Sequence, residues 1–227
     1  TTLDTLGPIA RTVRDCLLVD AIIADAPLAP PALELRGLRF AVPEDVVMDD
    51  IDDHVARAFT SALSKLSAAG AEIIELPMKL LADAKQINLF SPMEAWAWHE
   101  RLVTEREALY DHRVAQRIRV GASYGAQDLQ RLRDERKGWI AAVESTIAGF
   151  DAMLMPTTPI VAPRTEALLA SDEAFFEANR LLLRNPALIN LLDGCALSLP
   201  CHRSGDLPVG LMVAAPAMQD AKLIAIG

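Results

Sequence analysis

Residues 38–77, LRFAVPEDVVMDDIDDHVARAFTSALSKLSAAGAEIIELP, set the class of the fold. The run at 38–43 is short and apolar, as a buried strand requires. The Asp pair at 52–53 can cap a helix whose apolar residues share one face, and Gly70 stops that helix. Residues 71–77 are expected to form the returning strand. A strand, a helix and a strand in so short a span predict a parallel pair joined by a right-handed crossover.

Three further apolar runs predict strands in the second half of the chain. They are DAMLMP (151–156), CALSLPC (195–201) and VGLMVAAP (209–216). The first and third are continuously apolar, which suits strands covered on both faces by helices. All three are expected to be buried on both faces and paired at both edges. The chain is therefore predicted to be α/β, with three α/β/α layers around a central mixed, largely parallel sheet.

Helices are expected on either side of the first strand. Thr12-Val-Arg-Asp15 is a capping box that begins an amphipathic helix, and PLAPP (27–31) is a stiff surface connector after it. Residues 80–149 are mostly helical in pattern, with turns expected at 91–92 and around 121–125.

The composition restricts the classes of partner. Apolar residues make up 52% of the 227 residues and charged residues 23%, which is enough for a substantial core. The formal net charge of −9 argues against nucleic acid and anionic membranes, because both attract basic surfaces. No apolar run approaches the length of a bilayer span.

Cysteine and histidine usage points to neither disulfides nor metal. Cys16, Cys195 and Cys201 form no disulfide framework. Four histidines are scattered without the spacing of metal ligands: His54, His99, His112 and His202. We expect a reduced, cytoplasmic protein without metal or cofactor.

The segment GASYG (121–125) matches G-x-S-x-G, the pattern of a nucleophile elbow around Ser123. That elbow needs a strand before the serine and a helix after it. Here the flanking segments are both helical in pattern. We interpret the segment as a corner between two helices.

Other candidate groups also fail as catalytic sites. Cys201 and His202 are neighbours in a predicted strand, so their side chains point to opposite faces and cannot pair. Cys195 and Cys201 are expected to fill core space. Trp96 and His99 share a helical face that suits packing, although the pair could line a pocket. The carboxylate pairs at 49–50 and 52–53 suit helix capping.

Three stretches in order resemble the amidase signature family. TTLDTLGPIARTVRDC (1–16) resembles the family's S-L-D-x-x-G-P-x-A-R-[ST]-V-x-D block. FDAMLMPTTPIVAP (150–163) resembles its D-x-L-x-x-P-T-[TS]-P-x-x-A-P strand and loop, and residues 190–227 resemble its closing segment. Where many members read N-x-x-G-x-P-A-x-S-x-P, this chain has NLLDGCALSLP (190–200). This departure is more similar to bacterial amidases or allophanate hydrolases than to the subunit that amidates glutamyl-tRNA.

The resemblance implies an amide hydrolase with a Ser, cis-Ser and Lys triad. In the family these three residues lie upstream of the block that 1–16 resembles, and this chain contains no Gly/Ser-rich segment of that kind. We therefore expect residues 1–227 to be the C-terminal portion of a single amidase-signature domain, with no catalytic residue of its own and no activity alone.

The resemblance also implies substrate-binding residues for a small-molecule amide. Thr157 and Thr158 follow a strand and would face the site, although they equally suit a turn before Pro159. Arg117 matches a position that binds a substrate carboxylate in some relatives, and a surface salt bridge is the alternative.

Two other functions stay open. The chain could be a non-catalytic α/β binding or scaffold protein that keeps the family's shell, or a subunit of a glutamine-dependent amidotransferase. Uncovered strand edges and helix-packing surfaces would promote self-association, so we expect a homo-oligomer.

Overall fold

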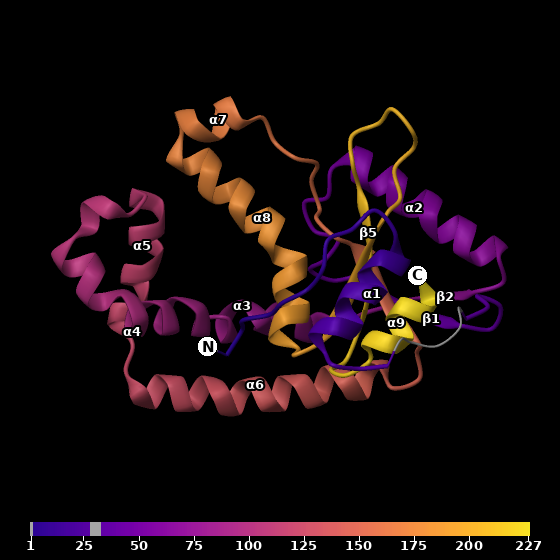
Figure 1. Ribbon diagram of the computed structural model, residues 1–227, viewed down its shortest axis with the longest axis horizontal. Coiled ribbons are helices and arrows are strands. Elements are labelled where there is room, and N and C mark those ends of the chain that lie inside the picture. The colour runs from indigo at the N-terminus through magenta and orange to yellow at the C-terminus, as the bar shows by residue number, and fades with distance from the viewer. Residues whose placement is uncertain (1, 28–32) are drawn as a thin grey trace.

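A five-stranded mixed sheet forms the centre of the computed structural model, which describes residues 2–27 and 33–227 (Figure 1). The strand order is β2-β1-β3-β5-β4. The strands are β1 (Arg39–Pro43), β2 (Glu72–Leu76), β3 (Ala152–Pro156), β4 (Cys195–Pro200) and β5 (Gly210–Ala215). The pairs β1–β2 and β1–β3 are parallel, whereas β3–β5 and β4–β5 are antiparallel. The predicted α/β class with a mixed sheet is confirmed.

Helices cover both faces of this sheet. The α-helices are α1 (Val13–Ile23), α2 (Asp53–Ala68), α3 (Ala84–Ile87), α4 (Phe90–Glu105), α5 (His112–Val120), α6 (Ala126–Ile147), α7 (Thr165–Ala170), α8 (Asp172–Leu191) and α9 (Asp220–Ile226). Three short 3₁₀ helices within the described residues are η1 (Lys79–Asp83), η2 (Glu107–Leu109) and η3 (Gly121–Ser123). Helices α2 and α9 pack on one face, and α3, α6 and α8 pack on the other.

The β1–α2–β2 unit forms as predicted. Asp52 caps α2, because its Oδ1 accepts a hydrogen bond of 2.7 Å from the Val55 amide. The apolar face of α2 buries Phe59 against Phe40 and other core residues of this side of the sheet. The first helix is likewise capped by Thr12, whose Oγ1 accepts from the Asp15 amide.

The core on the opposite face of the sheet is built from methionines of the strands and large apolar side chains of the helices. Met153 and Met212 of the sheet pack in one cluster with Trp139 of α6 and Leu191 of α8. The indole Nε1 of Trp139 donates to the Leu80 carbonyl at 2.7 Å, so this large side chain is buried with its polar atom satisfied.

Strand β4 lies at the edge of the sheet, which corrects one expectation. Strands β3 and β5 are buried along almost their whole length, as predicted. In β4, exposure alternates, and Ala196, Ser198 and Pro200 are exposed. The prediction of two buried faces and two paired edges for 195–201 was wrong, because β4 pairs only with β5 within the described residues and lies at the end of the sheet, where one of its faces stays exposed.

Residues 80–149 are mostly helical, as predicted, but one of the expected turns lies elsewhere. The expected turn at 91–92 lies inside the first turn of α4, where a proline needs no intrahelical hydrogen-bond partner. The chain breaks at 106–111 instead, and the corner at 121–125 is confirmed. Helices α7 and α8 had no predicted counterpart. The expected connector at 27–31 falls almost wholly outside the described residues.

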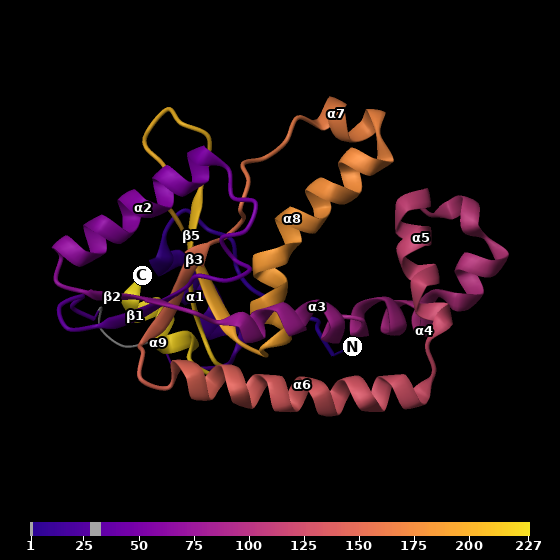
Figure 2. The same cartoon turned by 180° about the vertical axis from the view of Figure 1, so that it is seen from behind.

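Two helical arms extend away from the sheet (Figures 1 and 2). One consists of α4 and α5, and the other of α7 and the first turns of α8. Several apolar side chains of the N-terminal segment and α1 are exposed: Leu6, Ile9, Leu18, Val19, Ile22 and Ile23. Within the described residues, no helix has both the length and the apolar character needed to cross a membrane.

Candidate functional site

Helix α8 is bordered by three cavities that contain two of the three predicted substrate-binding residues, Thr157 and Arg117. The arginine cavity, of about 430 Å³, is lined by Asp49, Asp50, Lys85, Arg117, Arg180 and Arg184, among others. The middle cavity, of about 610 Å³, includes Pro92, Arg117, Leu183, Pro186 and Asn190. The threonine cavity, of about 470 Å³, includes Pro8, Thr157, Pro186, Asn190 and Cys195. Shared lining residues connect the three cavities around the helix.

Thr157 lies at the end of β3 and is held by two strands. Its amide donates to the Gly210 carbonyl at 2.8 Å, and its Oγ1 lies 2.6 Å from the Ser198 hydroxyl oxygen. A Cβ at Gly210 would lie 2.5 Å from Thr157 Oγ1, so only glycine fits there without displacing the pair. The hydroxyl pair therefore sits at a defined place beside the threonine cavity.

Thr158 has a different environment. Its Oγ1 donates to the Ile160 carbonyl at 2.9 Å, two residues along the same loop. Thr158 is not among the residues that line the three cavities. This geometry agrees with a turn-stabilising role, and its substrate-binding role stays a prediction.

The loop after β3 is attached to its surroundings by two polar residues. Asn185 of α8 is fully buried, and its Nδ2 donates to the Pro156 carbonyl at 2.8 Å and the Val47 carbonyl at 3.1 Å. The other is Asp52, whose Oδ2 accepts from the Val161 amide at 2.9 Å. Asn185 was not predicted from the sequence, since nothing local in α8 distinguishes a buried amide from an exposed one.

Arg117 lies in the last turn of α5 and is exposed. It lines the arginine and middle cavities but not the threonine cavity, so the structure does not place it in one cavity with Thr157. No salt bridge joins Arg117 to another residue of the described chain, which leaves the predicted surface ion pair without support. Its role toward a carboxylate stays a prediction.

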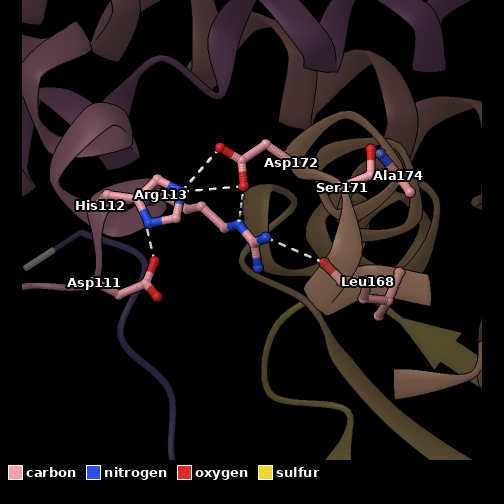
Figure 3. A network of polar contacts seen from close by, with 7 residues as sticks. All are labelled: Asp111, His112, Arg113, Leu168, Ser171, Asp172 and Ala174. Atoms are coloured by element: carbon pink, nitrogen blue, oxygen red, sulfur yellow. Dashed lines mark hydrogen bonds and ion pairs between the residues drawn. The ribbon is translucent and has the colours of Figure 1, made fainter. Parts of the chain in front are cut away.

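One turn before Arg117, Arg113 ties α5 to the other arm (Figure 3). Its side chain is almost fully buried, and its Nε donates to Asp172 Oδ1 at 2.6 Å. Its Nη2 donates to the Leu168 carbonyl at 3.1 Å, and its guanidinium lies 4.4 Å from the centre of the Phe175 ring. The bonds from Arg113 and then His112 hold the pKa of Asp172 below its usual value. This cluster holds together the two arms that border the middle cavity.

The serine at 123 lies in no elbow. It belongs to η3, which directly follows α5 and precedes α6, so helices flank it on both sides as expected. A Cβ at Gly121 would lie 2.0 Å from the Pro92 carbonyl oxygen, so this glycine allows α4 and α5 to approach closely. The interpretation as a helical corner is confirmed.

The thiols of Cys195 and Cys201 are unsuited to nucleophilic attack. Burial raises the pKa of Cys195 to about 11 and also raises the pKa of Cys201. Both pack against the core, as expected. His202 is occupied by its own hairpin, because its Nδ1 accepts from the Val209 amide at 3.2 Å.

The remaining candidates have structural partners. His99 Nδ1 lies 2.8 Å from the Tyr110 hydroxyl, and Trp96 is half-buried beside Gly121. Among residues 2–27 and 33–227, no three His, Cys, Asp or Glu side chains gather as metal ligands would.

The chain is similar to amidases over its whole length. The sequence profile of the family described as Amidase matches residues 1–224. A 2-amino-5-chloromuconic acid deaminase of Comamonas testosteroni is 29% identical over 231 residues, which cover 99% of this chain and 50% of that relative. One subunit of the glutamyl-tRNA(Gln) amidotransferase of Roseiflexus castenholzii is 27% identical over 263 residues, with 99% and 53% covered.

A solved structure supports the same relationship. The crystal structure of an amidase superposes with a TM-score of 0.81 at 26% identity, over 96% of this chain and 50% of that one. The chain thus spans about half the length of the curated relatives it matches. With a profile match over residues 1–224 and an amidase-signature architecture, this chain belongs to the amidase family.

Proposed function

We propose that the complete protein hydrolyses a carboxylic amide that carries a carboxylate group, and that this chain forms the substrate-binding portion. The observation that carries the proposal is the Amidase match over residues 1–224 of a chain that spans about half of its relatives. The family resemblance assigns the Ser, cis-Ser and Lys to the other half. Residues 1–227 alone are then a C-terminal portion without activity.

The proposed chemistry is acyl transfer to water. The nucleophilic Ser attacks the amide carbonyl, while the Lys accepts its proton through the second Ser. Backbone amides stabilise the oxyanion, the amine leaves with a proton, and water then cleaves the acyl-enzyme. No residue of this chain is assigned to these steps.

Two features support a substrate with a carboxylate. Arg117 is unpaired within the described residues and lines two cavities beside α8. The Comamonas testosteroni relative is named as a deaminase of 2-amino-5-chloromuconic acid, an acid that is anionic at neutral pH. Thr157, at the threonine cavity, would contact the uncharged part of the substrate.

The experiment is a steady-state assay of the complete protein on small amides with and without a carboxylate. Replacing Thr157 and Thr158 with Val removes the hydroxyl groups, and a hydrogen bond lost to the substrate is worth about 1 kcal/mol or somewhat more, so kcat/KM should fall about tenfold. Unchanged kinetics would show that the threonines are turn residues only. Glutaminase activity seen only with further subunits and a charged tRNA would instead support the amidotransferase alternative.

We also propose that the exposed apolar side chains of the N-terminal segment and α1 are covered by assembly, as a homo-oligomer or with the remaining half of the protein. Ile9, Ile22 and Leu6 are each more than three-quarters exposed, which favours association. The three free cysteines suit a cytoplasmic location. Size-exclusion chromatography with light scattering tests the assembly, and a stable monomer of residues 1–227 would contradict it.

A further inference from the structure

The charges that line the arginine cavity do not balance. Its cationic residues are Lys85, Arg117, Arg180 and Arg184, and its anionic residues are Asp49 and Asp50. The chain as a whole carries a net charge of −9, so a local excess of positive charge at a cavity runs against the overall composition. Such an excess attracts anions.

Arg180 does not contribute to this excess, because two carboxylates already neutralise it. Its Nη2 lies 2.7 Å from Glu177 Oε1 and 3.3 Å from Asp50 Oδ2. These bonds raise the pKa of Arg180 above its usual value. Asp50 is therefore used within the protein, and Asp49 is the remaining acidic group of the cavity.

Arg184, one turn along α8, has no such partner. Its Nε donates to Asn185 Oδ1 and its Nη2 to the Val47 carbonyl, both at 3.1 Å, so both acceptors are neutral. No carboxylate of the described chain pairs with it within 4.0 Å. Burial lowers the pKa of Arg184, and Asp49 and Asp50 only partly oppose this effect. A half-buried cation normally has a counter-charge.

We propose that Arg184 binds the carboxylate of the substrate in the arginine cavity, with Arg117 and Lys85 adding positive charge. The proposal rests on the proposed function for the identity of the anion. The two bonds from Nε and Nη2 fix the plane of the guanidinium, and Nη1 donates to nothing in the described chain. A guanidinium held in this way can grip a carboxylate with parallel hydrogen bonds. Arg184 thus selects acidic over neutral substrates.

The test compares Arg184→Gln with Arg180→Gln in the complete protein. Succinate is the probe, neutral succinamide is its uncharged counterpart, and titration calorimetry measures binding. Succinate should bind to the unmodified protein and to Arg180→Gln, and Arg184→Gln should weaken binding about tenfold or more, because a charged hydrogen-bond donor is lost. Succinamide should bind to none of the three.

Several results would overturn the assignment. They are absent succinate binding, an equal loss in both variants, and inorganic phosphate binding as tightly as succinate. If thermal melting shows that Arg184→Gln is unfolded, Arg184→Lys replaces it. Lysine keeps the charge but loses the planar fork, so succinate binding should still weaken severalfold. Unchanged affinity in Arg184→Lys would count against the proposal.

A kinetic readout separates this proposal from the proposed function. In Arg184→Gln the KM for an amide that carries a carboxylate should rise relative to the KM for a neutral amide. If the complete protein hydrolyses amides but the ratio of these two KM values is unchanged in Arg184→Gln, only the role of Arg184 is refuted. If succinate binds through Arg184 but no amide is hydrolysed, the proposed function fails alone.

Discussion

Asn185 offers the sharpest test of how α8 positions the loop that carries Thr157. The substitution is Asn185→Leu, which keeps a similar size but removes both donors. The fully buried Nδ2 donates to the Pro156 carbonyl at 2.8 Å and to the Val47 carbonyl at 3.1 Å. The Pro156 carbonyl directly precedes Thr157, so losing this bond frees the start of the loop.

The two bonds that Asn185 donates have different costs, and the bond that its Oδ1 accepts from Arg184 Nε at 3.1 Å is lost as well. The Val47 carbonyl still accepts from Arg184 Nη2 at 3.1 Å, so it keeps a partner. The Pro156 carbonyl loses the only side-chain bond that the described residues give it. A lost hydrogen bond costs about 1 kcal/mol and an orphaned buried acceptor about 1–3 kcal/mol, so the total is about 3 kcal/mol. For a chain of this size, that lowers Tm by about 6–12 °C.

Calorimetric or circular-dichroism melting measures the loss of stability. Asn179→Leu is the matched control, since Asn179 lies on the same helix and its side chain makes no hydrogen bond to the described chain. Amide exchange at Thr157, whose N–H bonds to Gly210, should also accelerate in Asn185→Leu only. Equal melting temperatures for the two variants would refute the role assigned to Asn185.

Three further outcomes are expected. Ser123→Ala should leave the activity of the complete protein unchanged in a steady-state assay, because Ser123 lies in a helical corner; a large loss of turnover would contradict this. Gly210→Ala should destabilise the protein by about 1–3 kcal/mol in urea titrations, since its Cβ would lie 2.5 Å from Thr157 Oγ1 and 2.6 Å from Ser198 Oγ. The folded pKa of Cys195, about 11, lies above the usual 9.0, so its contribution to stability is complete below pH 9 and lost as pH rises toward 11. At pH 8, iodoacetamide should spare Cys195 in the folded protein and modify it in urea, and equal labelling would disprove burial of the thiol.

Much of the secondary structure could be read from local patterns. All five predicted strands are present within a residue of their expected ends, and Thr12 and Asp52 cap the helices they were expected to cap. Apolar runs and capping residues act over a few neighbouring positions, so their consequences are visible without tertiary contacts. The ordered motifs that resemble amidases are linear in the same sense, and the profile match confirms the family.

The arrangement of the site depends on contacts between distant residues. Asn185 bonds to Val47, 138 residues away in the sequence, and Thr157 meets Ser198 across a separation of 41. Whether β4 is a central or an edge strand depends on the sheet order, which its own alternating residues do not encode. In the same way, Arg180 and Arg184 are the same residue type, one turn apart on α8. The folded chain supplies carboxylate partners to Arg180 but none to Arg184. Burial and pairing of polar groups are properties of the assembled core, because both depend on which segments pack together.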